Sequence, residues 1–146
     1  MDPQINESSP SAQAHLSILQ SVIQRMAANS TSCKAWCITL VSAILVIVAD
    51  KGKPEYALIA LLPVLLFMAL DTYYLWLEIG FRDSYERFVK KLHLGESSPS
   101  DLYRVVPEGD KFVHFTKAIT SFSVAPFYIA LIALVLIAQH VVLKAT

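Results

Sequence analysis

The sequence predicts an all-α membrane protein with three transmembrane helices, an N-terminal amphipathic helix and a second span that extends into the cytoplasm. Composition points to this class, because 55% of the 146 residues are hydrophobic and only 16% are charged, whereas about a quarter of a typical soluble domain is charged. The apolar residues also form three blocks rather than the spaced pattern of an amphipathic core. Three short spans offer too little polar surface to enclose a pathway alone, so we expect a homo-oligomer.

The N-terminal third is predicted to be a tail followed by a helix. Residues 1–10 carry two prolines and no large apolar residue apart from Ile5, which is typical of a disordered tail. Residues 11–33 read as an amphipathic helix, with Leu16, Leu19 and Ile23 recurring at steps of three and four. Arg25 is its only basic residue, so packing against another helix, including one from a second copy, is favoured over lying on lipid.

Three segments are apolar enough to be spans: residues 34–50, 55–80 and 118–143. Residues 50–54, with two lysines, a glycine and a proline, are typical of a tight turn between the first two spans. Pro63 and Pro126 are expected to bend the second and third spans. Residues 81–117 are predicted to be a cytoplasmic helix and loop, with the helix continuing from the second span and ending near Gly95.

The distribution of basic residues predicts the orientation. With the N-terminus in the cytoplasm, nine lysines and arginines lie inside and three, Lys51, Lys53 and Lys144, lie outside. This agrees with the excess of basic residues found in cytoplasmic loops. The sequence therefore predicts a bacterial inner-membrane protein with a cytoplasmic N-terminus and a periplasmic C-terminus.

Asp71 is the carboxylate that needs an explanation, because it lies within the second span, where an ionised group must face protein or water. Asp71, Tyr74, Glu78 and Arg82 fall on one helical face. Three interpretations remain open: an Asp71 that is protonated or held by hydrogen bonds from Tyr, Ser or Asn side chains on neighbouring helices, an ion pair with Arg25 or Lys34, or an acidic ring along a water-filled path between subunits. By depth, Lys34 is expected to reach Glu78 more easily. The candidate pore-lining or helix-pairing residues are Asp71, Tyr74, Glu78, Arg25, Asn29 and Lys34.

A basic cluster follows the second span. It has two interpretations: contact with anionic lipid headgroups, or an anionic-ligand site formed by charges that converge from several subunits. The candidate ligand-binding residues are Arg82, Arg87, Lys90, Lys91 and Arg104.

Motifs for other chemistry are missing from the sequence. There is no glycine-rich phosphate loop or nucleophile elbow, and Cys33 and Cys37 lack two further ligands for a metal site. We therefore expect no enzymatic activity, no cofactor and no metal. The formal net charge is zero, so bulk charge gives no indication of a nucleic-acid polymer as partner.

Two stretches, residues 23–45 and 70–88, resemble signature segments of a family of small bacterial membrane effector proteins encoded beside TIR or nucleotide-signalling phage-defence genes. The matching positions are Ile23, Arg25, Met26, Ala27, Asn29, Ser30, Lys34, Trp36, Leu70, Asp71, Tyr73, Tyr74, Leu75, Glu78, Phe81, Arg82 and Tyr85. The match covers about a third of the chain, and no motif is matched after residue 93.

The resemblance implies an oligomeric effector of anti-phage defence, a pore or ion channel that permeabilises or depolarises the inner membrane when triggered. Its partners would be the lipid bilayer, further copies of itself, and a nucleotide second messenger or a partner protein that produces the signal. The alternative is a non-conducting membrane anchor or adaptor subunit of a larger complex.

Overall fold

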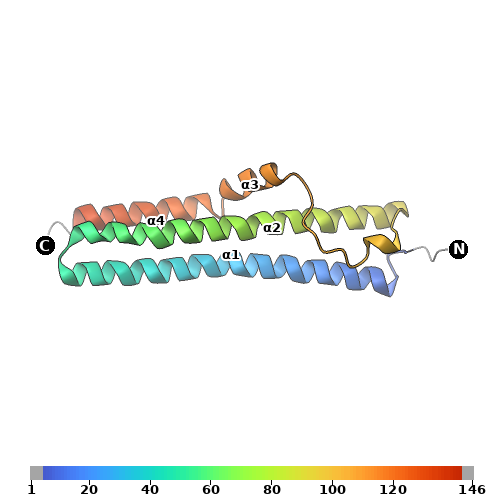
Figure 1. Cartoon of the computed structure of the whole chain (residues 1–146), viewed down its shortest axis with the longest axis horizontal. Coiled ribbons are helices and arrows are strands. Elements are labelled where there is room, and N and C mark those ends of the chain that lie inside the picture. The colour runs from blue at the N-terminus through green and yellow to red at the C-terminus, as the bar shows by residue number, and fades with distance from the viewer. Residues whose placement is uncertain (1–4, 143–146) are drawn as a thin grey trace.

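The chain forms a long, narrow helical rod (Figure 1). This computed structural model describes residues 5–142, and all regular elements in that part of the chain are helical. Helices α1 (Pro10–Lys51) and α2 (Leu61–Leu94) run antiparallel along the rod, and α4 (Ala125–Ile137) packs beside one half of them. The short helix α3 (Lys111–Ile119) lies against α2 near the middle of the rod. The predicted all-α class is confirmed.

Helix α1 is a single element of 42 residues, about 63 Å at 1.5 Å per residue. It begins with Pro10 in its first turn, where the missing N–H has no intrahelical partner to lose. The predicted amphipathic segment 11–33 and the apolar segment 34–50 are therefore two parts of one uninterrupted helix.

Residues 5–10 differ from the disorder predicted for residues 1–10. Ile5 is buried against Ala12, Phe88 and Leu92, and its carbonyl accepts a hydrogen bond of 2.9 Å from the Ser97 hydroxyl. The burial of Ile5 and this hydrogen bond together hold the segment against the ends of α1 and α2. The remainder of the predicted tail, residues 1–4, lies outside the described residues.

The second long helix starts as a 3-10 helix, η1 (Pro54–Ala60), and continues as α2. It runs from the apolar segment into the polar one without interruption, as the sequence predicts. Its end at Leu94 is set by Gly95, whose φ of 68° is readily adopted by glycine. The Glu96 N–H then bonds to the Lys91 carbonyl and the Gly95 N–H to the Leu92 carbonyl, which caps the last turn.

The third apolar segment is not one helix over 118–143, and this prediction is corrected. Helix α3 ends at Ile119 and α4 begins at Ala125, with a turn between them. The Ser121 hydroxyl accepts a hydrogen bond from the Val124 N–H, and this side-chain acceptor competes with regular helical bonding in the turn. A short π-helix, η3 (Ala138–Val142), follows α4 and packs against η1.

The rod has two halves with different surfaces. The apolar half, built from the second part of α1, η1, the first part of α2, and α4, has a core that includes Val41, Val64 and Tyr128. The polar half has a smaller core of Ile5, Ala12, Phe88 and Leu92.

Two helical segments, Pro10–Lys51 and Glu55–Leu94, are long and apolar enough to cross a membrane, and Ala125–His140 is a shorter apolar helix. In each of the two long segments only 22% of the most apolar window is buried, whereas the core helix of a soluble protein would be mostly covered. Large side chains such as Val46, Leu62 and Ile129 are about two-thirds exposed.

Candidate functional site

A buried cluster of polar side chains joins α1 to α2 where the two halves of the rod meet. The Lys34 ammonium nitrogen lies 2.6 Å from Asp71 Oδ2, and the Asp71 side chain is fully buried. The Ser30 hydroxyl donates to Asp71 Oδ1, and Lys34 Nζ lies 3.3 Å from the Ser30 oxygen. We call Ser30, Lys34 and Asp71 the ion-pair cluster.

Helical spacing brings this cluster to the contact between the helices. The buried residues of α1 recur at steps of three and four and form one stripe, which contains Ser30, Cys33 and Cys37. Lys34 follows Ser30 by four residues and lies at the edge of the stripe, with its side chain 18% exposed. A buried carboxylate is thereby compensated by one cation and one hydroxyl from the neighbouring helix.

Two of the three interpretations of Asp71 describe contacts present in the structure: the ion pair with Lys34 and the hydrogen bond from a serine. The carboxylate faces the interior of this chain and not a surface. Glu78 does not pair with Lys34, contrary to expectation; it lies 2.7 Å from Arg82, four residues along the same helix. Lys34 is already paired with Asp71. Glu78 and Arg82 are four residues apart on one helix, a spacing at which opposite charges can pair.

The other candidate pore-lining or helix-pairing residues lie outside the ion-pair cluster. Tyr74 packs edge-on against Tyr73, with 5.7 Å between ring centroids. Arg25 is exposed and Asn29 is half-buried, and within residues 5–142 neither forms an ion pair or a hydrogen bond with Asp71.

Tyr128 of α4 was missed by sequence reasoning. It is 1% exposed, its hydroxyl has no hydrogen-bond partner among the described residues, and the Asp71 carboxylate lies within its electrostatic reach. No local signal distinguishes this tyrosine in an apolar run, because its neighbour comes from a helix more than fifty residues earlier.

A second candidate site is a cavity of about 160 Å³ in the polar half, between α1, α2 and the loop that follows η2 (Pro99–Asp101). The loop is fastened to α2 at several points. The Ser84 hydroxyl donates to the Val106 carbonyl at 2.6 Å, and the Glu108 N–H donates to the Gly80 carbonyl at 3.0 Å. We call this space the polar-end cavity; its ionisable lining residues are His15, Arg87, Lys91, Asp101, Arg104 and Glu108.

Gly80 allows the loop to lie this close to the helix. A Cβ atom at this position would stand 2.7 Å from the Cβ of Pro107, well inside van der Waals contact. Only glycine lets the loop backbone reach the helix surface here without displacement. The path of the loop beside the cavity therefore depends on Gly80.

The polar-end cavity contains three of the five basic candidates. Arg87 Nε lies 2.8 Å from Glu108, and Lys91 Nζ lies 2.7 Å from Asp101. The hydrogen bond from Lys91 is the main cause that lowers the pKa of Asp101. Arg104 also lines the cavity and is exposed. Arg82 instead borders a separate groove beside Gln20 and Tyr85, and Lys90 points to solvent.

His15, Asp101 and Glu108 are ionisable cavity residues that sequence reasoning missed, and His15 is the most buried of them. It is 2% exposed, its Nδ1 accepts a hydrogen bond of 3.0 Å from the Tyr103 N–H, and its ring meets Phe88 edge-on. Burial lowers the pKa of His15, partly offset by the nearby Asp101 charge. The spacing of Ala12, His15 and Leu19 on one face of a helix is a signal that identifies His15 as inward-facing.

Within residues 5–142 no group of three His, Cys, Asp or Glu residues is placed to hold a metal ion. Cys33 and Cys37 are both buried free thiols. No protein-family model, curated protein or solved structure matches this chain.

Proposed function

We propose that this chain is an oligomeric membrane effector of bacterial anti-phage defence, which permeabilises or depolarises the inner membrane when a nucleotide-like signal or a partner protein triggers it. The observation that carries the proposal is the ion-pair cluster at the base of an apolar bundle whose outer surface is largely uncovered. The defence role rests on the family resemblance of residues 23–45 and 70–88.

The dimensions of the apolar half support three spans. From Lys34 to Lys51 α1 rises about 26 Å, and α4 with η3 covers a similar length beside it. Both lengths approach the roughly 30 Å thickness of a hydrocarbon core. In this arrangement the turn at Gly52 and the end of η3 lie on the periplasmic side, and the ion-pair cluster lies just inside the cytoplasmic boundary.

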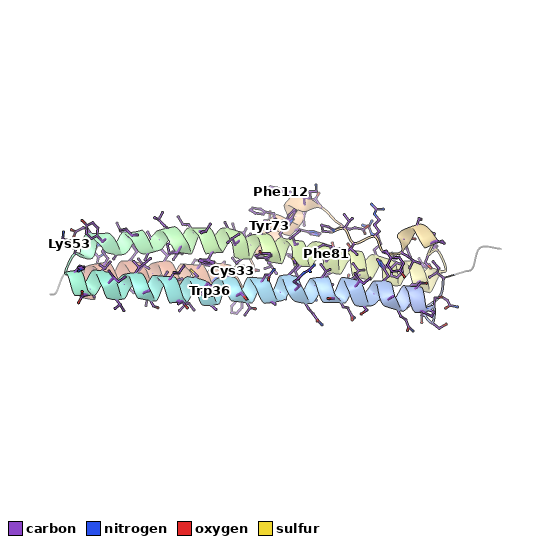
Figure 2. All side chains as sticks on the ribbon, turned by 60° about the horizontal axis from the view of Figure 1, so that its bottom comes forward. Cys33, Trp36, Lys53, Tyr73, Phe81 and Phe112 are labelled. Carbon is purple, nitrogen blue, oxygen red and sulfur yellow. The ribbon has the colours of Figure 1, made fainter. Side chains whose placement is uncertain are left out.

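Aromatic residues support the same boundary. Trp36 and Tyr73 are 62% and 49% exposed, and Figure 2 shows both near the middle of the rod, with Phe112 close by and Lys53 at one end. Exposed tryptophan and tyrosine favour the membrane–water interface. Helix α3 carries Phe112 and Phe115 on an exposed face, and its first carbonyl, of Lys111, accepts a hydrogen bond of 3.1 Å from the Trp76 indole, which holds α3 at this level.

The ion-pair cluster supports a closed resting state. With the Lys34 and Asp71 charges facing each other inside one chain, neither charge is presented on the outer surface of the apolar half to line a pathway. Separation of α1 from α2 would expose both charges, and in an oligomer these would face water rather than lipid. We therefore interpret the cluster as a latch between a closed and an open assembly, with the signal acting through the polar half.

The test is a leakage assay with the purified chain in liposomes that contain a self-quenching dye. We expect wild-type liposomes to retain the dye and Asp71→Asn liposomes to release it, because the latch is broken. Glu86→Gln, on the exposed polar part of α2, is the control and should retain the dye. In cells, infection should collapse the membrane potential, read with a potential-sensitive dye; protection with the potential intact would exclude the pore.

A non-conducting anchor or adaptor is the second candidate, and one observation favours it: Asp71 is neutralised within its own chain and is fully buried. In that case the exposed apolar and polar surfaces would bind an unlike subunit. Affinity purification in detergent distinguishes the two, because an adaptor co-purifies with a stoichiometric unlike partner and an effector gives a homo-oligomer by native mass measurement.

A further inference from the structure

The polar-end cavity combines a small, partly open volume with an excess of positive charge. Its volume of about 160 Å³ is below the roughly 300 Å³ at which pockets for drug-sized ligands begin, so it suits a small molecule or one end of a larger one. Three basic side chains and two acidic ones line it. The two acids form ion pairs with Arg87 and Lys91. The Arg104 guanidinium therefore has no acidic partner among the described residues.

His15 adds a second donor that no described residue uses. Because Nδ1 accepts the Tyr103 N–H, a neutral imidazole carries its proton on Nε2. No residue in the described range accepts a hydrogen bond from Nε2, although the side chain is 2% exposed and lines the cavity. The Nε2 atom is not among the fully buried atoms that lack a partner, so this N–H is open to the cavity, where a bound molecule can accept from it.

The loop that closes the cavity is held in a strained conformation. Tyr103 has a φ of 61°, the single non-glycine residue with positive φ in the described part of the chain. Its N–H is the donor to His15, so the strained residue and the buried histidine are parts of one contact. Strain of this kind, on the order of 1–3 kcal/mol, persists where surrounding contacts enforce it and is concentrated at ligand sites.

We propose that the polar-end cavity binds a small soluble anion that carries phosphate, with Arg104 and the His15 Nε2–H as its donors. A guanidinium presents two parallel N–H groups to two phosphate oxygens, and a neutral imidazole N–H satisfies a third. Arg87 and Lys91 are paired with Glu108 and Asp101 and hold the loop in place, so the excess positive charge of the cavity comes from Arg104. The site lies within one chain and does not require charges from several subunits.

A soluble anion fits this position better than a lipid headgroup. Ser84 and Lys91 lie six and thirteen residues beyond Glu78 on α2, or about 9 and 20 Å along the helix. The headgroup layer on each side of the hydrocarbon core is only about 5–7 Å thick. Placement of the boundary near Glu78 rests on the proposed membrane arrangement, whereas the cavity and its donors do not.

The experiment measures binding of pyrophosphate to the full chain in detergent by isothermal titration calorimetry at fixed ionic strength. For a ligand of this size in a preformed site we expect a Kd on the order of 1 mM or tighter. Arg104→Gln, on the exposed loop, should weaken binding at least about tenfold. Lys90→Gln is the matched control: it removes one positive charge from exposed α2 outside the cavity and should change the Kd less than twofold.

Two results would overturn the proposal. One is equal weakening of binding by Arg104→Gln and Lys90→Gln, because it would show a diffuse charge effect. The other is the absence of any heat of binding at 10 mM pyrophosphate. Nanodiscs separate the two possible sources of phosphate. The Kd should be the same in phosphatidylcholine discs and in discs that contain phosphatidylglycerol, whereas competition by phosphatidylglycerol would assign the donors to headgroups and overturn a soluble ligand.

Different results would overturn the proposed ligand site in the cavity and the proposed pore. Pyrophosphate binding that depends on Arg104, without dye release from any liposome, supports the cavity and overturns the proposed pore. Dye release by Asp71→Asn with no pyrophosphate binding supports the pore and overturns the cavity.

Discussion

The two halves of the rod are built on the same pair of helices but are held together by different interactions. In the apolar half a third helix covers part of α1 and α2, and one buried ion pair joins α1 to α2 at the inner end of this half. In the polar half α1, α2 and the segment before α1 share a core of four buried residues, and a loop bound by two partly exposed ion pairs replaces the third helix.

The difference shows where each half is sensitive. The apolar half depends on the compensation of one buried charge, because no water is available to replace a lost partner. The polar half depends on loop placement, because its ion pairs are partly exposed and individually weak. The ion-pair cluster lies between the halves, so a change in α1–α2 packing in the polar half can reach it along two continuous helices.

The largest expected effect is loss of the Asp71 charge. Asp71→Asn leaves the Lys34 ammonium without its partner; removal of one member of a buried pair commonly costs about 3–5 kcal/mol, and the lower end applies because Lys34 is 18% exposed. At about 4 °C per kcal/mol the unfolding midpoint should fall by roughly 10 °C. Circular dichroism in detergent measures it.

The control for Asp71→Asn is the double variant Lys34→Met with Asp71→Leu, which removes both charges and keeps apolar volume. It should recover most of the lost stability, since an apolar pair can replace a buried ion pair at little net cost. If both variants are equally unstable, the charge is not the source of the effect and packing at this position is.

The next effect concerns the polar half and its loop. Gly80→Ala places a Cβ where the Cβ of Pro107 lies 2.7 Å away, so the loop must move outward. The loss of stability should be about 1–3 kcal/mol, as for overpacked cores. Hydrogen exchange should speed up in residues 102–108 and stay unchanged in α4. Ser97→Ala, which removes one hydrogen bond at the far end of the loop, should leave residues 105–108 as protected as in the wild type.

Acid is expected to loosen the polar half before the apolar half. Burial lowers the pKa of His15 below its ordinary 6.5, so the unfolded chain takes up the proton first as pH falls. Stability is unaffected above pH 6.5 and declines below it, toward the lowered pKa. Asp101 faces the same cavity, but its pKa is lowered from 3.8, so its contribution is lost only at lower pH.

Hydrogen exchange at pH 7.5 and 5.5, corrected for intrinsic rates, measures this change. Protection should fall in residues 97–108 and stay constant in α4. His15→Asn keeps an acceptor near the Tyr103 N–H and should abolish the pH dependence, while His93→Asn, at an exposed position, should retain it. Equal loss of protection in both halves would mean that a group other than His15 causes the pH dependence.

The sequence predicts most of the helical architecture because the apolar blocks and the face shared by Phe88 and Leu92 have helical periods, and Gly95 marks the end of α2. It predicts Lys34 as a partner of Asp71 only as one of several possibilities, since depth along two helices does not fix which side chains touch. The break at residues 120–124 was missed because serine hydrogen bonds compete with a strongly apolar pattern.

The polar-end cavity was only partly predictable. Arg87 and Lys91 are one turn apart on α2, and their proximity follows from helical spacing. Arg104 reaches the same cavity through a loop whose path depends on its contacts with Gly80 and Ser84 of α2. These contacts join residues far apart in the sequence, so no local sequence pattern predicts them. His15 lay on a recognisable inward face, but its hydrogen bond to Tyr103 depends on that same loop.

The smallest expected effect tests whether the apolar half contains a second polar interaction. The Tyr128 hydroxyl is buried and has no hydrogen-bond partner among the described residues, so Tyr128→Phe removes a desolvated group and leaves no donor or acceptor newly unpaired. Stability should stay within about 1 kcal/mol of the wild type or rise. Tyr73→Phe, at an exposed tyrosine of α2, is the control for loss of a hydroxyl. A midpoint lowered by Tyr128→Phe alone would mean that the hydroxyl donates to Asp71, which would extend the ion-pair cluster to α4 and bind all three helices of the apolar half to one carboxylate.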